Sequence, residues 1–142
     1  IGFWVARTMN GRGSGWGTGP GVGGEPLSGG AFGAMGERVE ADDETGAGMM
    51  IGEIGGPQEA EASLWARDNM SKPIVGYVAG LSAPRGRRMG HAGAIISAFG
   101  DSALEKAEIM RNSGLTVAAS PAELGTAMKL ALAKPARRVV LA

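Results

Sequence analysis

The sequence has 142 residues, the length of one ordinary domain, and this is enough to bury a hydrophobic core. Its 14 basic and 14 acidic residues balance, which argues against broad electrostatic binding to nucleic acid or to an anionic membrane. The chain has no cysteine, which excludes disulfides and thiolate chemistry, and no apolar run is long enough to cross a bilayer.

Glycine is concentrated in the N-terminal part of the chain, where residues 1–56 hold 18 of the 26. Within the glycine-rich segment, GVGGEP (residues 21–26) is typical either of a strand end that opens into a loop or of a flexible linker. Gly36, Gly46 and Gly48 fall where a helix and a strand are expected, and glycine inside such elements costs about 0.5–1 kcal/mol. We therefore expect this third of the chain to be less stable than the rest.

The first half of the chain predicts two helices, two strands and the remnant of a further helix. The remnant lies at residues 3–10, and residues 31–41 predict a helix that glycine weakens. The apolar runs at 47–54 and 74–79 predict buried strands. A helix between them begins at Pro57, a favourable first helical position, with Ala60 and Leu64 on its core face.

The second half of the chain predicts two further helices separated by a short strand. Ser102–Glu105 and Ser120–Glu123 have the spacing of capping boxes, in which a serine and a glutamate cap the start of a helix. The first helix extends to about Ser113 and Gly114 ends it, so residues 115–118 predict a strand. The second helix ends before Pro135 and places on one face Leu124, Met128 and Ala131.

Strands that alternate with helices in this way predict an α/β fold with a parallel sheet covered on both faces. At the edge formed by the carboxyl ends of such strands, ligands commonly bind. Glu53 ends the first predicted strand at this edge and is followed by two glycines. From these residues alone, Glu53 is either a site residue or a solvated carboxylate at a strand end.

The only histidine, His91, lies in a loop that follows the second predicted strand. Arg85, Arg87 and Arg88 precede it, and glycines flank it on both sides. Glycine lets phosphate approach the backbone, arginine binds phosphate or carboxylate oxygens, and imidazole is a nucleophile near neutral pH. This chemistry suits a residue that carries a covalent group between two half-reactions, although a single histidine in a basic loop is also commonly a solvated surface residue.

The stretch from Lys72 to Ile96, KPIVGYVAGLSAPRGRRMGHAGAII, closely resembles the phosphohistidine segment of one protein family. The family is that of the α subunits of succinyl-CoA synthetase and malate–CoA ligase, which are ADP- or GDP-forming acid–CoA ligases. GVGGEP resembles the family's GIGGDP, and GEIGG (residues 52–56) resembles its glutamate segment. The resemblance covers about residues 3–132 and is to the C-terminal, ligase half of the subunit. It implies a flavodoxin-like three-layer fold, with a ligase domain over residues 1–134 and a tail over 135–142.

The resemblance also implies roles for individual residues. His91 would be the transient phosphate carrier, and Glu53 would orient its imidazole and raise its nucleophilicity. Phe3 stands where many relatives have a tyrosine at the substrate site. The phosphate would also contact the chain at Gly90 and at position 92, which is Ala92 here.

Partners and co-substrates follow from the same resemblance. It implies CoA and ATP or GTP with magnesium, all bound mainly outside this segment, and a C4 dicarboxylate substrate. It further implies an ATP-grasp β subunit and a bacterial cytoplasmic location, with no nucleic acid or membrane partner and no resident metal. Residues 54–63 and 97–110 are more similar to malate–CoA ligase than to succinate enzymes, so malate is favoured over succinate.

Some features depart from the family. The family's serine-containing phosphate loop would precede Ile1, and Trp16 and Gly17 replace a usual polar residue and a usual serine. A chain without that loop would lose half of the phosphate site and would not complete a turnover. A non-catalytic remnant of the domain is therefore an alternative. A flavin binder is disfavoured, because aromatic residues make up 5% of the chain and do not cluster at a strand end.

Overall fold

The computed structural model describes residue 17 and residues 32–90, 93–98 and 100–135. Within them, three parallel strands form one sheet in the order β1-β2-β3: β1 (Gly48–Gly52), β2 (Ile74–Val78) and β3 (Thr116–Val117). Gly48 lies beside Ile74 in the β1–β2 pair, and Val75 lies beside Thr116 in the β2–β3 pair. The predicted α/β class with a parallel sheet is confirmed.

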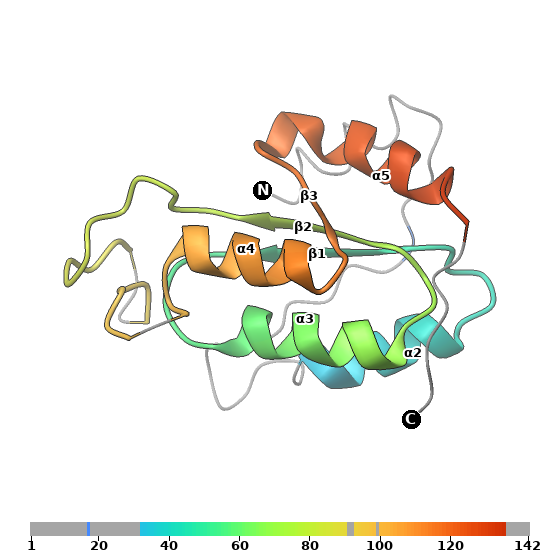
Figure 1. The fold of residues 1–142 in the computed structure, drawn as a ribbon, viewed down its shortest axis with the longest axis horizontal. Coiled ribbons are helices and arrows are strands. Elements are labelled where there is room, and N and C mark those ends of the chain that lie inside the picture. The colour runs from blue at the N-terminus through green and yellow to red at the C-terminus, as the bar shows by residue number, and fades with distance from the viewer. Residues whose placement is uncertain (1–16, 18–31, 91–92, 99, 136–142) are drawn as a thin grey trace.

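Helices lie on both faces of this sheet, as Figure 1 shows. The elements are α2 (Phe32–Ala41), α3 (Gln58–Asn69), α4 (Ala103–Asn112), the short 3₁₀ helix η1 (Pro121–Glu123) and α5 (Leu124–Leu132). One face carries α5, whereas α3 and α4 lie side by side on the other face with α2 packed against α3. The described part of the chain therefore has the expected three layers.

Each face of the sheet has its own hydrophobic core, because successive side chains of a strand point to opposite faces. Ile74 and Val78 of β2 join the core beneath α3 and α4, which also contains Ala66, Met70 and Met110. Val75 points the other way and packs with Leu124, Met128 and Ala131. The predicted core face of the last helix is thus confirmed, and β2 contributes buried side chains to both cores.

Helix α3 does not bury the face that the sequence predicted. Ala60 is buried as expected, but Leu64 is 44% exposed. The buried residues of α3 include Glu59, Ser63 and Ala66. The helix presents this face to the core because Glu59 forms an ion pair with Lys106 of α4. Pro57 is the N-cap of α3 rather than its first helical residue, so the helix begins one residue later than predicted.

One of the two predicted capping boxes is present and the other is wrong. At the start of α4, Ser102 and Glu105 form a complete box. At Ser120 the serine side chain makes no capping hydrogen bond to the backbone, and the chain forms the 3₁₀ turn η1 before α5 begins at Leu124. In this turn the Glu123 amide donates to the Ser120 carbonyl at 3.1 Å, so the amide that the hydroxyl would cap already has a partner.

Gly36, which the sequence marked as a weakness of α2, allows a close helix contact. A Cβ atom built on Gly36 would lie 2.4 Å from Cζ3 of the Trp65 ring on α3. Gly48 is different, because its Cβ would lie 3.6 Å from the Ile74 side chain, an ordinary contact. Glycine is therefore required by packing at residue 36 but not at residue 48.

Several predictions lie outside the described residues: the helix over 3–10, the GVGGEP segment and the tail after residue 135. Among the residues that the structure does describe, no helix is long and apolar enough to cross a membrane.

Candidate active site

The GEIGG segment forms a tight turn where β1 ends. Glu53 directly follows the strand and is exposed. Gly55 and Gly56 have φ angles of +92° and +69°, a conformation that side chains with a Cβ rarely adopt. The turn therefore holds Glu53 at the carboxyl edge of the sheet, as the sequence predicted.

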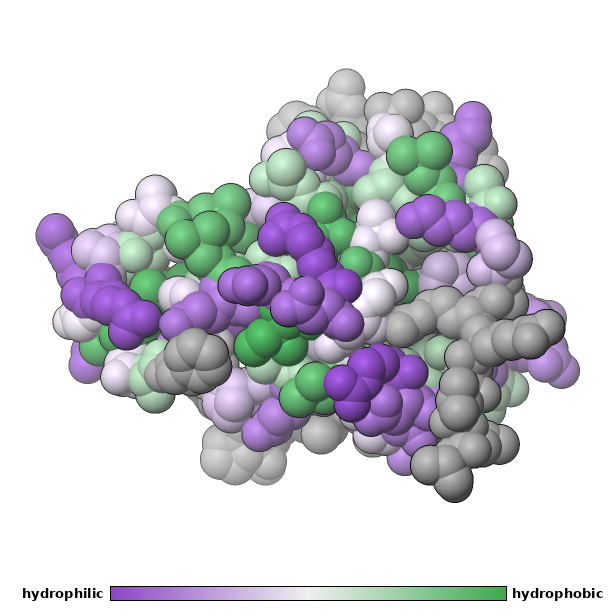
Figure 2. All heavy atoms as spheres, viewed as in Figure 1, coloured by the Kyte–Doolittle hydropathy of each residue, from purple (hydrophilic) through white to green (hydrophobic). Residues whose placement is uncertain are grey.

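The histidine loop, which is the connection between β2 and α4 (residues 79–102), leaves the sheet after Val78 and projects past the carboxyl ends of the strands (Figure 1). Arg85, Arg87 and Arg88 are exposed on it, and Figure 2 shows hydrophilic side chains gathered at this end of the molecule. The Arg85 guanidinium pairs with the Glu105 carboxylate at 3.3 Å, which ties the loop to the start of α4. The loop is thus cationic and is anchored to a helix cap.

Backbone hydrogen bonds tie together the two arms of the loop on either side of the histidine. The Met89 amide donates to the Ala94 carbonyl at 2.8 Å, and the Gly86 amide donates to the Ile96 carbonyl at 3.1 Å. Ala94 and Ile96 are buried in the core. The described arms before and after the histidine are therefore joined to each other by hydrogen bonds, and the second arm is seated on the core.

The GEIGG turn and the histidine loop come into close contact at Gly55. A Cβ atom on Gly55 would lie 1.9 Å from the Gly93 carbonyl oxygen, so only glycine fits there. Gly55 is two residues after Glu53, and Gly93 is two residues after His91. His91, Ala92 and Phe3 lie outside the described residues, but the segments that carry Glu53 and His91 lie side by side.

Asp101 forms hydrogen bonds both to the end of the histidine loop and to the GEIGG turn. Its Oδ2 atom accepts hydrogen bonds from the Ser97 amide at 2.9 Å, the Ser97 hydroxyl at 2.8 Å and the Ala98 amide at 2.7 Å. Its backbone carbonyl accepts from the Gly55 amide at 2.8 Å. Burial raises the pKa of the Asp101 carboxyl, but the hydrogen bonds from Ala98 and Ser97 outweigh this and hold the pKa below its ordinary value.

Sequence reasoning missed a buried ion pair beneath the GEIGG turn. Lys106 of α4 is fully buried and pairs with Glu59 of α3, which is also buried. A signal was present in the sequence: Lys106 lies on the same helical face as Ala103 and Met110, and a lysine on an apolar stripe needs a partner.

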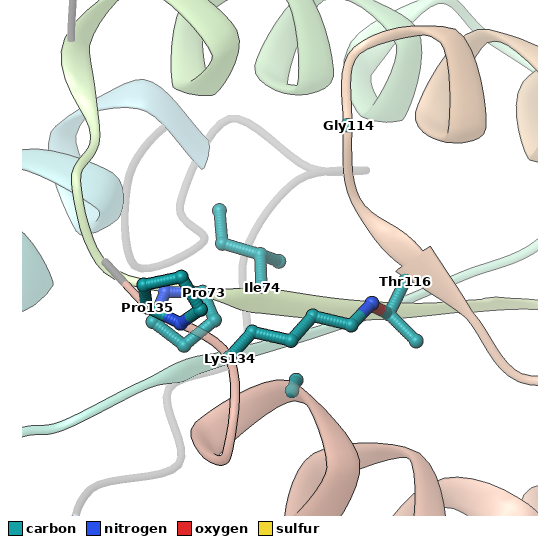
Figure 3. Close-up of a pocket in the computed structure, with 7 residues that line it drawn as sticks. Pro73, Ile74, Gly114, Thr116, Lys134 and Pro135 are labelled. Atoms are coloured by element: carbon teal, nitrogen blue, oxygen red, sulfur yellow. The ribbon is translucent and has the colours of Figure 1, made fainter. Parts of the chain in front are cut away.

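The structure also has a small pocket of about 80 Å³, but it lies at the opposite edge of the sheet. Ile74 and Thr116, the first residues of β2 and β3, line it together with residues near the end of α5 (Figure 3). The described residues contain no group of three or more side chains of the types that bind metal ions. The candidate site is therefore the edge formed by the GEIGG turn and the histidine loop.

Known proteins resemble this chain in sequence. No family model matches it. The α subunit of malate–CoA ligase from Methylorubrum extorquens is 57% identical over 136 residues, which are 96% of this chain and 46% of the relative. The α subunit of ADP-forming succinate–CoA ligase from Staphylococcus aureus is 47% identical over 117 residues, which are 82% of this chain and 39% of the relative. The chain thus spans less than half the length of these relatives.

Solved structures with the same fold include two ATP citrate lyases. That of Methanosaeta concilii, in complex with (3S)-citryl-CoA, has a TM-score of 0.76 and 24% identity and covers 91% of this chain and 21% of that one. That of Methanothrix soehngenii, in complex with citrate and coenzyme A, has the same values. At this identity the likeness shows the fold alone. The sequence similarity goes further, and it confirms the resemblance on which the site prediction rested: the chain is a homologue of part of the α subunits of malate–CoA and succinate–CoA ligases.

Proposed function

We propose that this chain is the phosphohistidine-bearing part of an acid–CoA ligase α subunit that joins CoA to a C4 dicarboxylate at the expense of ATP or GTP. The observation that carries the proposal is the contact between Gly55 and Gly93, which brings the Glu53 turn against the histidine loop. The similarity to a malate–CoA ligase subunit makes malate the first candidate acid. Succinate is second, on the similarity to succinate–CoA ligase subunits.

The proposed reaction passes one phosphoryl group through His91. An imidazole nitrogen attacks the terminal phosphorus of the nucleotide, an N–P bond forms, and the nucleoside diphosphate leaves. A carboxylate oxygen of the acid then attacks this phosphorus, and the N–P bond breaks to leave an acyl phosphate. The CoA sulfur attacks the acyl carbon, the thiol proton is lost to solvent, and inorganic phosphate leaves. Magnesium, when bound with the nucleotide, would neutralise phosphate charge, and nucleotide and CoA are held mainly outside the described residues.

The residues of this chain have three roles in the scheme. Glu53 accepts a hydrogen bond from the imidazole, orients it and favours the attacking form. Gly90, which is exposed with a φ angle of +111°, and Ala92 present backbone to the phosphoryl group. Phe3 contacts the dicarboxylate.

We assign the second chain of the enzyme, an ATP-grasp β subunit, to the same edge of the sheet. The relatives are named as α subunits, which implies a partner subunit. Leu81 and Met89 support the placement, because both are large apolar side chains that the histidine loop leaves exposed. Because the relatives named above come from bacteria, we assign the complete enzyme to the bacterial cytoplasm.

Phosphorylation of the chain tests the proposal. The full-length α subunit, mixed with its β subunit and γ-labelled ATP or GTP, should incorporate label that is lost in acid and kept in base, as phosphohistidine is. His91→Asn keeps a polar group of similar size without the nucleophile, so label and thioester formation should vanish while the protein still folds. Glu53→Gln keeps the shape without the charge, so labelling should slow by about 10- to 100-fold.

Two results would reject this assignment. One is label that survives acid, which would indicate a phosphorylated hydroxyl instead. The other is undiminished label in the His91→Asn protein. Circular dichroism of each variant checks that a loss of label does not come from unfolding.

A further inference from the structure

The described side-chain hydrogen bonds of the buried pair, Glu59 and Lys106, join the two residues to each other and to the GEIGG turn. The Lys106 ammonium donates to the carbonyl oxygens of Glu53 and Gly55, each at 2.8 Å, and to the Glu59 carboxylate. An ammonium has three donors, so these contacts satisfy all of them. The second Glu59 oxygen accepts from the Glu53 amide at 3.2 Å. Both backbone groups of Glu53 are thus held from below by two side chains of other elements.

Neighbouring glycines fit this arrangement on two sides. A Cβ atom on Gly52 would lie 2.2 Å from the Glu59 carboxylate oxygen, so glycine there makes room for the pair. On the other side, Gly55 both accepts from Lys106 and lies against the Gly93 carbonyl of the histidine loop. A continuous line of contacts therefore runs from Lys106 through Gly55 to the segment that carries His91.

Stability alone does not account for the pair. Taking two charges out of water is costly, and a buried ion pair can often be replaced by apolar residues of similar volume without loss of stability. In the same interface, Ala66 and Met110 show that α3 and α4 pack with apolar side chains. What apolar residues could not do is hold two carbonyls and one amide of a turn in fixed positions.

We propose that Glu59 and Lys106 are positioning residues for the phosphoryl transfer: they fix the backbone of the turn so that the Glu53 carboxylate meets the imidazole of His91. This inference rests on the proposed function. The pair acts through Glu53 and touches no substrate. Misplacing a catalytic group by about 1 Å can cost a factor on the order of 100 in rate.

The decisive experiment compares phosphorylation rates of the full-length α subunit with its β subunit and labelled nucleotide. In the variant Glu59→Leu with Lys106→Met, both charges are removed and the volume is kept, so no charge is left buried alone. Labelling of His91 should slow by about 10- to 100-fold, as expected when a supporting residue is lost. Glu59→Gln is a milder second variant, which should slow labelling less and serves if the double variant does not fold.

A double-mutant cycle separates positioning from general damage. In a Glu53→Gln background the same double change should reduce the rate by no more than about twofold, because the group that it positions is already disabled. Two controls perturb the same interface. Ser63→Ala removes a buried hydroxyl that donates to the Glu59 carbonyl at 2.6 Å, and Met110→Ala opens a cavity one turn beyond Lys106. Both should leave the labelling rate within about twofold of wild type.

Amide hydrogen exchange gives a readout that does not depend on activity. The Glu53 and Gly55 amides should exchange at least about 10-fold faster in the double variant than in wild type, and their exchange rates should be unchanged in Ser63→Ala. Unchanged exchange rates at these amides in the double variant would overturn the proposal. It would also be overturned if the double change reduced the labelling rate by the same factor in the wild-type and Glu53→Gln backgrounds. If wild-type protein takes no label at all, the proposed function fails, and the exchange data still decide whether the pair holds the turn.

Discussion

At the scale of single residues, buried charges shape the candidate site. Asp101 is 5% exposed, yet one of its oxygens accepts three hydrogen bonds from Ser97 and Ala98. These bonds fold the chain back toward the start of α4. There the Asp101 carbonyl accepts a hydrogen bond from the Gly55 amide. Asp101 therefore links the end of the histidine loop to the GEIGG turn through two different atoms.

Replacing Asp101 with asparagine should destabilise the fold by about 1–3 kcal/mol at neutral pH, because the hydrogen bonds lose their charged acceptor. The native pKa of Asp101 is lowered, so its carboxylate stabilises the fold above the unfolded value near 3.8, and this contribution is lost as the pH falls through the lower native pKa. The stability difference between wild type and variant should thus be constant from about pH 5 to 8 and should shrink below about pH 4. Urea unfolding across this range measures it.

The matched control is Asp43→Asn, which changes an exposed carboxylate in the turn after α2. It should shift the free energy of unfolding by less than about 0.5 kcal/mol. A stability difference for Asp101→Asn that stays the same down to pH 3 would contradict the role of its charge.

At the scale of elements, the contact between α2 and α3 depends on one glycine. Helix α2 contains Gly33 and Gly36, which look equivalent in the sequence. Among the described residues outside its own turn of helix, no atom lies within 4 Å of a Cβ placed on Gly33, whereas a Cβ on Gly36 would overlap the Trp65 ring. The same helix thus offers one glycine that only weakens it and one that its packing requires.

Gly33→Ala should therefore raise the free energy of unfolding by about 0.5–1 kcal/mol, because alanine loses less backbone entropy in a helix. Gly36→Ala gains the same entropy but must displace a rigid indole, and should lower the free energy of unfolding by about 1–3 kcal/mol. Denaturant titration of both variants measures the contrast. In a Trp65→Leu background the cost at Gly36 should largely disappear, and a cost that persists there would show that the indole is not its cause.

At the scale of the whole molecule, the edge of the sheet where the strands end differs from the edge where they begin. Among the described residues, the carboxyl edge carries Glu53, the histidine loop and the exposed arginines, whereas the amino edge carries the small pocket beside Ile74 and Thr116. Two helical layers hold the sheet between these edges, and each layer has its own core. Contacts with the other parts of an acid–CoA ligase would therefore form at the carboxyl edge.

The choice of acid belongs to the complete enzyme, and we expect it to favour malate. If its site hydrogen-bonds the malate hydroxyl, succinate leaves buried polar groups unpaired, and kcat/KM for malate should exceed that for succinate by a factor of at least about 10. Thioester formation by the full-length α and β subunits with each acid at matched concentration measures this ratio. Equal or faster turnover of succinate would favour the succinate–CoA ligase assignment.

Local patterns in the sequence predicted most of the elements correctly. The apolar run before Glu53 forms β1, and Gly114 ends α4 with a φ angle of +80°. The face of α5 that carries Leu124 and Met128 is buried as expected. These features succeed because alternation, helical periodicity and glycine stops depend on residues close to one another in the chain. The stretch from Lys72 to Ile96 and the GEIGG segment likewise indicated the family from the sequence alone.

What only the tertiary structure decided involves partners distant in sequence. Leu64 is exposed and Glu59 buried because Lys106, 47 residues away, supplies a charge for Glu59. Gly36 is required rather than merely tolerated because Trp65 of another helix lies over it. The meeting of Gly55 with Gly93 likewise depends on how a turn and a loop pack at one edge of the sheet. The free energy of burying a charge or a ring depends on what surrounds it in space, and a pattern of neighbours along the chain does not contain that information.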